Sequence, residues 1–77
     1  MAEKVVGVKQ SRRALREGRA AKVYLAADAD PAVTEPIRVL CQERGLPVDC
    51  SCRMDELGRS AGIQVGAAVV TILREAL

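Results

Sequence analysis

The sequence predicts a layered α/β sandwich formed by one domain that spans residues 1–77. Two observations favour this class. Short apolar and partly β-branched runs alternate with segments whose apolar residues recur at helical spacing. Apolar residues also make up 49% of the chain, which is too many for a disordered tail and enough for one compact core. Because Tyr24 is the single aromatic residue, that core has to be built from Ala, Val, Leu and Ile.

The amino-terminal segment predicts an edge strand followed by a basic amphipathic helix. Val5 and Val6 form the short apolar strand, and Gly7 follows it. We expect the helix to begin near Lys9 and to end at Gly18. The small or apolar residues at helical spacing are Ser11, Ala14, Leu15 and Gly18. The polar positions between them are Lys9, Gln10, Arg12, Arg13, Arg16 and Glu17.

The middle of the chain predicts a central strand and a second helix. Residues 22–27 are apolar without alternation behind one Lys, which is typical of a strand covered on both faces. Asp30 is suited to cap the following helix, with Pro31 at its first position. Pro36 disfavours helical geometry at the residue before it, which allows the helix to begin in two steps. Gly45 ends the helix. Its expected buried face consists of Val33, Ile37, Leu40 and Cys41.

The remaining segment predicts a strand, a short helix and a last strand. Residues 46–51 follow a tight turn and are expected to be extended. Residues 53–61 are expected to form the helix, and Gly62 is its expected stop. The apolar, β-branched stretch that closes the chain predicts a strand from about Ala68 to Leu73.

Positive charge is concentrated at the amino-terminal end. Seven of the twelve Lys and Arg residues fall in the first 22 positions, where only Glu3 and Glu17 oppose them. Such an end is typical of a surface that binds a polyanion, most often RNA or DNA. A solvated helix face that binds nothing explains the charge equally well. The scarcity of aromatic residues argues against proteins that stack bases on exposed rings.

The junction between the first strand and the first helix has the chemistry of a nucleic-acid contact. Gly7 lets a ligand approach the backbone, and the free N–H groups of a first helical turn favour phosphate. Lys9 and Arg13 share a face and can donate to guanine, while Gln10 can donate and accept on a base edge. An ordinary helix start with a solvated face remains the alternative.

Catalytic and metal chemistry is not expected. The chain has no His, which removes the commonest general base and metal ligand. Cys50 and Cys52 lack the usual zinc spacing, and Cys41 falls on an apolar helix stripe. The carboxylates fit helix caps and helix starts better than a Mg²⁺ site. Free thiols, with no signal peptide or membrane-spanning run, predict a cytoplasmic protein that needs no cofactor and no membrane.

Four sequence blocks in a defined order cover nearly the whole chain. They are residues 7–10, 26–31, 41–47 and 57–63, the last followed by the closing strand at 66–70. Together they resemble the kink-turn-binding ribosomal proteins, the "seven-Ae" and "thirty-e" superfamily, in its short bacterial form. The resemblance implies a three-layer α/β/α sandwich around a mixed four-stranded sheet.

The resemblance also implies a function and a set of contact residues. It implies a non-enzymatic, monomeric protein that binds structured RNA containing a kink-turn, with ribosomal RNA as one candidate. The implied contacts of the first helix are Gly7, Lys9, Gln10, Arg13 and Arg16, and those of a second loop are Ser51, Cys52, Arg53 and Met54. Family members more often have Asn-Glu where Lys9-Gln10 stands, so this contact zone is more positive. Met54 is equally well explained as a core residue. A protein-interaction subunit on the same fold is the alternative function.

Overall fold

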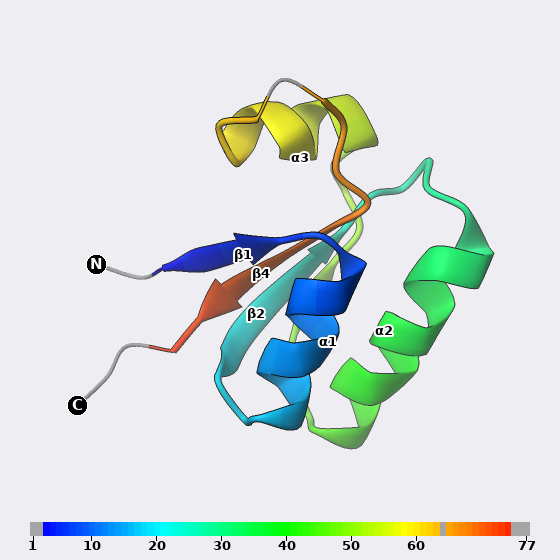
Figure 1. Cartoon of the computed structure of the whole chain (residues 1–77). Coiled ribbons are helices and arrows are strands. Elements are labelled where there is room, and N and C mark those ends of the chain that lie inside the picture. The colour runs from blue at the N-terminus through cyan, green and yellow to red at the C-terminus, as the bar shows by residue number, and fades with distance from the viewer. Residues whose placement is uncertain (1–2, 64, 75–77) are drawn as a thin grey trace.

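The computed structural model describes residues 3–63 and 65–74, which form a four-stranded sheet and three helices (Figure 1). The elements in chain order are β1 (Lys4–Val6), α1 (Val8–Arg16), β2 (Ala20–Leu25), α2 (Pro31–Glu43), β3 (Val48–Asp49), α3 (Met54–Ser60) and β4 (Val69–Leu73). The strand order is β1-β4-β2-β3, with β2 and β3 parallel and the other two pairs antiparallel. The sheet is therefore mixed.

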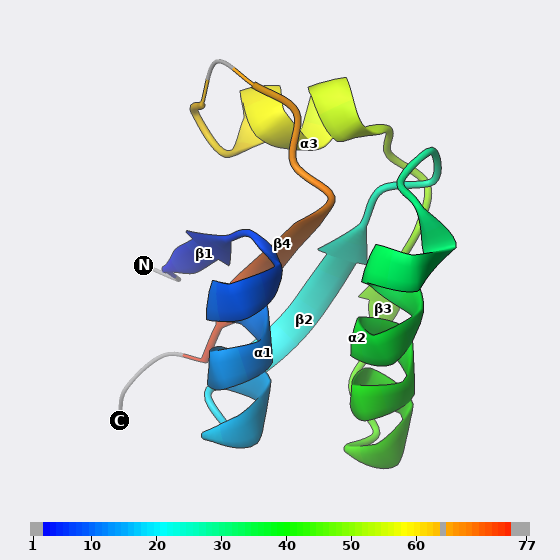
Figure 2. The same ribbon diagram turned by 45° about the vertical axis from the view of Figure 1, so that its right-hand side comes forward.

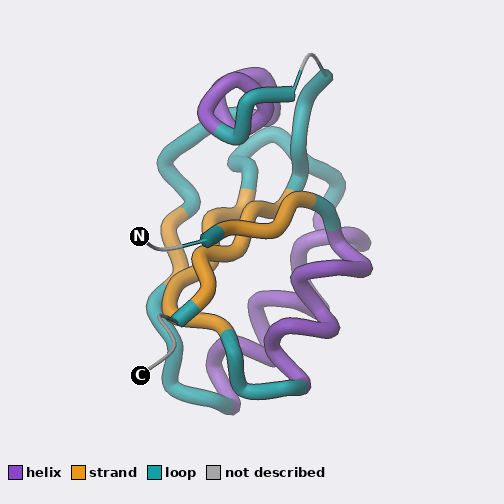
Figure 3. The backbone as a smooth tube through the Cα atoms, turned by 60° about the vertical axis from the view of Figure 1, so that its left-hand side comes forward, coloured by secondary structure: helices purple, strands orange, loops and turns teal. Residues whose placement is uncertain are grey.

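Helices α1 and α2 lie against one face of this sheet and the short α3 packs over one end of the other, which confirms the three-layer α/β/α sandwich (Figure 3). The larger buried cluster joins the sheet to α1 and α2; it consists of Leu15, Ala20, Val23, Leu25, Ile37, Cys41 and Val69. The smaller cluster lies beneath α3 and consists of Ala26, Leu57, Ala67 and Val70. Burial raises the pKa of the Cys41 thiol, in keeping with its predicted place in the core.

The central strand β2 is covered less completely than its sequence predicts. Alternation along the strand sends Val23 and Leu25 into the cluster beneath α1 and α2. Lys22 and Tyr24 face the other side, where they remain half-buried. The prediction of two covered faces is therefore wrong for these positions, because the short helix α3 reaches only one end of that face (Figure 1).

Helix α2 is one continuous helix, so the predicted two-step start at Pro36 is wrong. The Asp30 carboxylate accepts a hydrogen bond from the backbone N–H of Ala32 at 2.9 Å, as expected for a cap. Pro36 lacks a backbone donor, but it lies near the start of the helix on the exposed side, where water can satisfy the unpaired carbonyl. The helix ends before Gly45, whose φ of 65° lies in the left-handed region that favours glycine.

Strand β3 is shorter than the extended segment predicted for residues 46–51. Only Val48 and Asp49 pair with β2. The Asp49 carboxylate then accepts hydrogen bonds from the hydroxyl and the backbone N–H of Ser51, which turns the chain away from the sheet and lowers the pKa of Asp49. Cys50 and Cys52 therefore lie outside any strand, and the same-face orientation expected of a strand does not apply to them.

Two buried hydroxyl groups have no hydrogen-bond partner in the described structure, Ser11 Oγ on α1 and Thr71 Oγ1 on β4. Because an unpaired buried hydroxyl is destabilising, Thr71→Val should raise the free energy of unfolding by about 1 kcal/mol, and Ser11→Ala should not lower it. Urea denaturation followed by circular dichroism measures both. The exposed Ser60→Ala serves as the control and should change stability little. A clear loss of stability in Thr71→Val would contradict this prediction.

None of the helices in the described part of the chain has the length and apolar character that crossing a bilayer requires.

Candidate nucleic-acid interface

The amino end of α1 is an open helix terminus at one edge of the sheet (Figure 2). Gly7 joins β1 to α1 with φ 102° and ψ 161°, a conformation largely restricted to glycine, and its N–H donates to the carbonyl of Val69 at 2.9 Å. No side chain caps the helix. Within residues 3–63 and 65–74, the N–H groups of Val8, Lys9 and Gln10 have no partner. Because the first turn also holds no carboxylate, its positive end can accept an anion.

The predicted contact side chains of α1 are exposed, but Arg13 is already paired. Lys9 and Gln10 extend from the first turn. Arg13 Nε lies 3.4 Å from one carboxylate oxygen of Glu17, and Arg19 Nη1 lies 3.3 Å from the other. The hydrogen bonds from Arg19 and Arg13 hold the pKa of Glu17 below its usual range. Because these pairs are exposed to solvent, Arg13 can leave Glu17 for a ligand at small cost.

Backbone hydrogen bonds place the loop at residues 51–54 at the same end of the sheet's strands as Gly7. The N–H of Ala26 donates to the carbonyl of Ala68 at 2.9 Å, and the N–H of Ala27 donates to the carbonyl of Cys52 at 2.8 Å. On the other side of β4, the N–H of Gly7 donates to the carbonyl of Val69. Neighbouring chains in a sheet are about 4.8 Å apart, so three such steps put Gly7 and Cys52 about 14 Å from each other.

Asp28 fixes the start of α3 to the end of β2. Its Oδ1 accepts a hydrogen bond from the N–H of Met54 at 2.8 Å, and its Oδ2 lies 3.7 Å from Arg53 Nε. The N–H of Arg53 donates to Glu56 Oε1 at 2.9 Å, so the side chain of Glu56 satisfies the donor at the start of the helix. No local sequence pattern signals this role of Asp28, because its partner Met54 lies 26 residues away.

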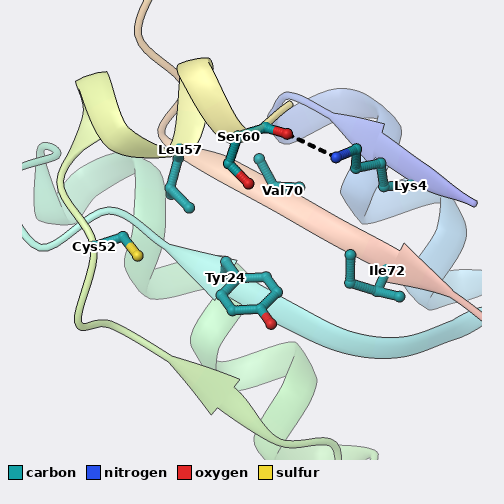
Figure 4. Close-up of a pocket in the computed structure, with 7 residues that line it drawn as sticks. All are labelled: Lys4, Tyr24, Cys52, Leu57, Ser60, Val70 and Ile72. Carbon is teal, nitrogen blue, oxygen red and sulfur yellow. Dashed lines mark hydrogen bonds between the residues drawn. The ribbon is translucent and has the colours of Figure 1, made fainter. Parts of the chain in front are cut away.

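The predicted loop residues point in different directions. Ser51 and Arg53 are exposed, whereas Met54 is half-buried and packs against the cluster beneath α3. Cys52 is also half-buried and turns toward the α3 face of the sheet (Figure 4). Arg16 lies seven residues after Lys9, about 10 Å further along α1, so the fold does not bring it to the open terminus.

Cys52 borders a hollow of about 220 Å³ on the α3 face of the sheet (Figure 4). The lining residues are Lys4, Tyr24, Cys52, Leu57, Ser60, Val70 and Ile72. Lys4 Nζ donates to the carbonyl of Ser60 at 2.7 Å, and Lys22 Nζ lies 4.8 Å from the centre of the Tyr24 ring. The hollow is smaller than the roughly 300–1,000 Å³ usual for small-molecule sites. Among the described residues, no group of three or more His, Cys, Asp or Glu side chains is arranged to hold a metal ion.

Asp28→Ala should lower the free energy of unfolding by about 1–2 kcal/mol, because the N–H of Met54 loses its charged acceptor. Thermal or urea denaturation measures the change. Asp28→Asn is the matched control, since it keeps an acceptor oxygen and loses only an exposed ion pair with Arg53. Equal losses in the two variants would show that the hydrogen bond is not the stabilising contact.

Fold and interface together define a small α/β/α sandwich that presents a cationic, uncapped helix end beside a fixed loop. This class of domain is suited to binding a polyanion. The chain belongs to the ribosomal protein L7Ae/L30e/S12e/Gadd45 family, whose model matches residues 2–76. The resemblance seen in the sequence is thereby confirmed.

Bacterial relatives match most of the chain. It is 46% identical over 70 residues to an RNA-binding protein of Geobacillus sp. (strain WCH70), covering 91% of this chain and 85% of the relative. It is also 46% identical over 70 residues to the RNA-binding protein YbxF of Geobacillus stearothermophilus, with the same coverage. These names describe binding proteins and no enzyme, in agreement with the non-enzymatic role that was expected.

Two solved structures share the fold. The 15.5kD RNA binding protein of Giardia lamblia is similar with a TM-score of 0.86 at 26% identity, covering 94% of this chain and 61% of that one. This chain therefore spans about three-fifths of the Giardia protein's length. A protein of unknown function from Bacillus halodurans is similar in fold, with a TM-score of 0.84 at 22% identity, covering 92% of this chain and 71% of that one.

Proposed function

We propose that this protein binds structured RNA, without catalysis, by recognising kink-turns, which are sharply bent internal loops with tandem sheared G·A pairs. The open amino end of α1 carries this proposal, because three backbone donors lie there beside Lys9 with no acidic residue in the first turn, and Arg13 follows about one turn further along the helix. Membership of the family and the names of the relatives support RNA as the polyanion.

The proposed contact depends on access to base edges. Regular duplex RNA has a deep, narrow major groove that side chains cannot enter. A sharp kink opens that groove, so the end of a helix about 10–12 Å wide can approach the bases. The free N–H groups then face phosphate, Lys9 and Arg13 donate to guanine, and Gln10 donates and accepts on a neighbouring base.

The loop at residues 51–54 is proposed as a second contact, about 14 Å from the first. Arg53 would exchange its pairing with Asp28 for a base face or a phosphate, and Ser51 lies exposed beside it. Met54 would offer the exposed part of its thioether. Cys52 faces the hollow, so its proposed part is to hold the shape of the loop.

A gel-shift experiment tests this function. The purified protein should retard an RNA containing a kink-turn much more strongly than a control RNA of equal length whose G·A pairs are replaced by Watson–Crick pairs. Binding should weaken as salt rises, because phosphate contacts release counterions. Equal retardation of both RNAs, or of neither, would refute the proposal.

The cellular setting is proposed on the same basis. We infer a cytoplasmic monomer, with RNA of the ribosome as one candidate partner. Crosslinking in cells followed by sequencing of the attached RNA identifies the partner, and light scattering of the purified protein measures its mass. Crosslinked RNAs without any kink-turn would count against the assignment.

A further inference from the structure

The outer flank of α1 carries a cationic surface that extends well beyond the open helix end. It consists of Lys9, Arg12 and Arg16, which we call the α1 stripe. At 100° per residue these three positions fall within about 60° of the helix circumference, and they span about 10 Å along its axis. All three are exposed, while Ser11, Ala14 and Leu15 on the opposite side are buried.

The α1 stripe differs in charge from its neighbours. The ion pairs found within residues 3–63 and 65–74 include none that involves the stripe. Next to it, Arg13 and Arg19 share the Glu17 carboxylate, so two cations there are offset by one acid. Among the described residues, the exposed surface of α1 is therefore divided into a stripe without a paired acid and a partly neutralised cluster at its carboxyl end.

We propose that the α1 stripe binds the phosphate backbone of the RNA helix that continues from the docked kink. This inference rests on the proposed function and adds a third contact zone to it, one that does not depend on the RNA sequence. A row of three cations along one helix flank complements a polymer with regularly spaced negative charges. A nucleic-acid duplex is such a polymer, and in DNA it carries roughly one negative charge per 1.7 Å of its axis. An acidic protein would need a matching row of carboxylates to do the same.

The uneven charge of the α1 surface limits where the RNA backbone is proposed to bind. Glu17 lies one position beyond Arg16, and its carboxylate offsets part of the positive charge of Arg13 and Arg19. The phosphate backbone is therefore attracted more strongly along the flank from Lys9 to Arg16 than to the partly neutralised cluster of Arg13, Glu17 and Arg19. Phosphate contacts of this kind position the partner and raise affinity, but they do not distinguish sequences.

The test is the double variant Arg12→Gln/Arg16→Gln, with fluorescence anisotropy across a series of salt concentrations. The two RNAs are the kink-turn RNA and its Watson–Crick control of equal length. The slope of log affinity against log salt should become shallower by about 1 for each lost phosphate contact, about 2 in all, with both RNAs. The ratio of the two affinities should stay unchanged, because Arg12 and Arg16 are proposed to contact phosphate and not base edges.

The matched control is Arg44→Gln/Arg59→Gln, which removes the same charge from exposed positions on α2's carboxyl end and on α3. It should leave the slope close to that of the unmodified protein. An equal change in both double variants would show a general charge effect and overturn the proposal. So would an unchanged slope in Arg12→Gln/Arg16→Gln, after circular dichroism has verified its fold.

The outcomes separate this inference from the kink-turn assignment. If the unmodified protein prefers the kink-turn RNA and the stripe variant keeps its slope, only the stripe is refuted. If the unmodified protein binds both RNAs alike while the stripe variant loses affinity for both, the stripe is supported and kink-turn recognition is refuted.

Discussion

Gly58→Ala should destabilise the domain by about 3 kcal/mol, at the upper end of the usual range for overpacking. Gly58 is buried in α3, and a Cβ atom there would lie 2.0 Å from the carbonyl oxygen of Val65. That oxygen belongs to the backbone, so no side-chain rotation relieves the clash, and α3 has to move away from the segment before β4. Urea denaturation followed by circular dichroism measures the loss.

Gly66→Ala is the matched control for this prediction. Its added Cβ would approach Met54 Cβ at 3.2 Å, a tight contact that a small shift relieves. We expect a clearly smaller loss than in Gly58→Ala. Similar losses in both variants, or a Gly58→Ala protein as stable as the unmodified one, would show that the packing of α3 is looser than the structure indicates.

Arg13→Ala should weaken the binding of a kink-turn RNA by about 1–3 kcal/mol if its guanidinium donates to a guanine through two hydrogen bonds. The expected loss is specific, because binding to the Watson–Crick control should change much less. Glu17→Gln should act in the opposite direction, since it frees Arg13 from its 3.4 Å pairing. Fluorescence anisotropy at one fixed salt concentration measures both.

Arg19→Ala is the control for the charge lost in Arg13→Ala. Arg19 also pairs with Glu17, at 3.3 Å, but it lies after the end of α1 and away from the open terminus. Its replacement should leave the preference for the kink-turn RNA intact. If Arg13→Ala and Arg19→Ala reduce that preference equally, Arg13 has no special contact with a base.

Local chemistry made much of the fold predictable. Asp30 caps α2, and the left-handed Gly45 follows the end of the helix, because capping and left-handed backbone geometry depend on the residue itself and its immediate neighbours. The buried stripe of α1 at Ser11, Ala14 and Leu15 follows from helical periodicity in the same way. These features need no knowledge of the rest of the chain.

Features that depend on distant partners were harder to predict. The extent of β3 is set by its pairing with β2 and by the turn at Asp49, and the half-exposed Tyr24 follows from the short reach of α3. The continuity of α2 through Pro36 depends on that residue facing solvent. None of these properties is encoded in a short sequence window.

The same distinction between local features and features that depend on distant partners applies to the candidate site. Gly7, Lys9 and Gln10 could be singled out from the sequence, because a strand-to-helix junction and a basic first turn are local. That Arg16 lies apart from them follows from helix geometry. Two other features could not be predicted, because they form only when the strands are assembled. The Cys52 side chain faces the hollow, and the N–H of Met54 donates a hydrogen bond to Asp28.

The hydrogen bonds that fix the two proposed contact segments have a kinetic consequence. They are made by the backbone of Gly7 and Cys52 and by the carboxylate of Asp28. Both segments lose their conformational freedom when the chain folds, so a docking partner has little left to immobilise. Association should then proceed at a rate set by diffusion and long-range attraction, without a slow rearrangement of the protein. Any sluggish phase in complex formation would have to originate in the partner.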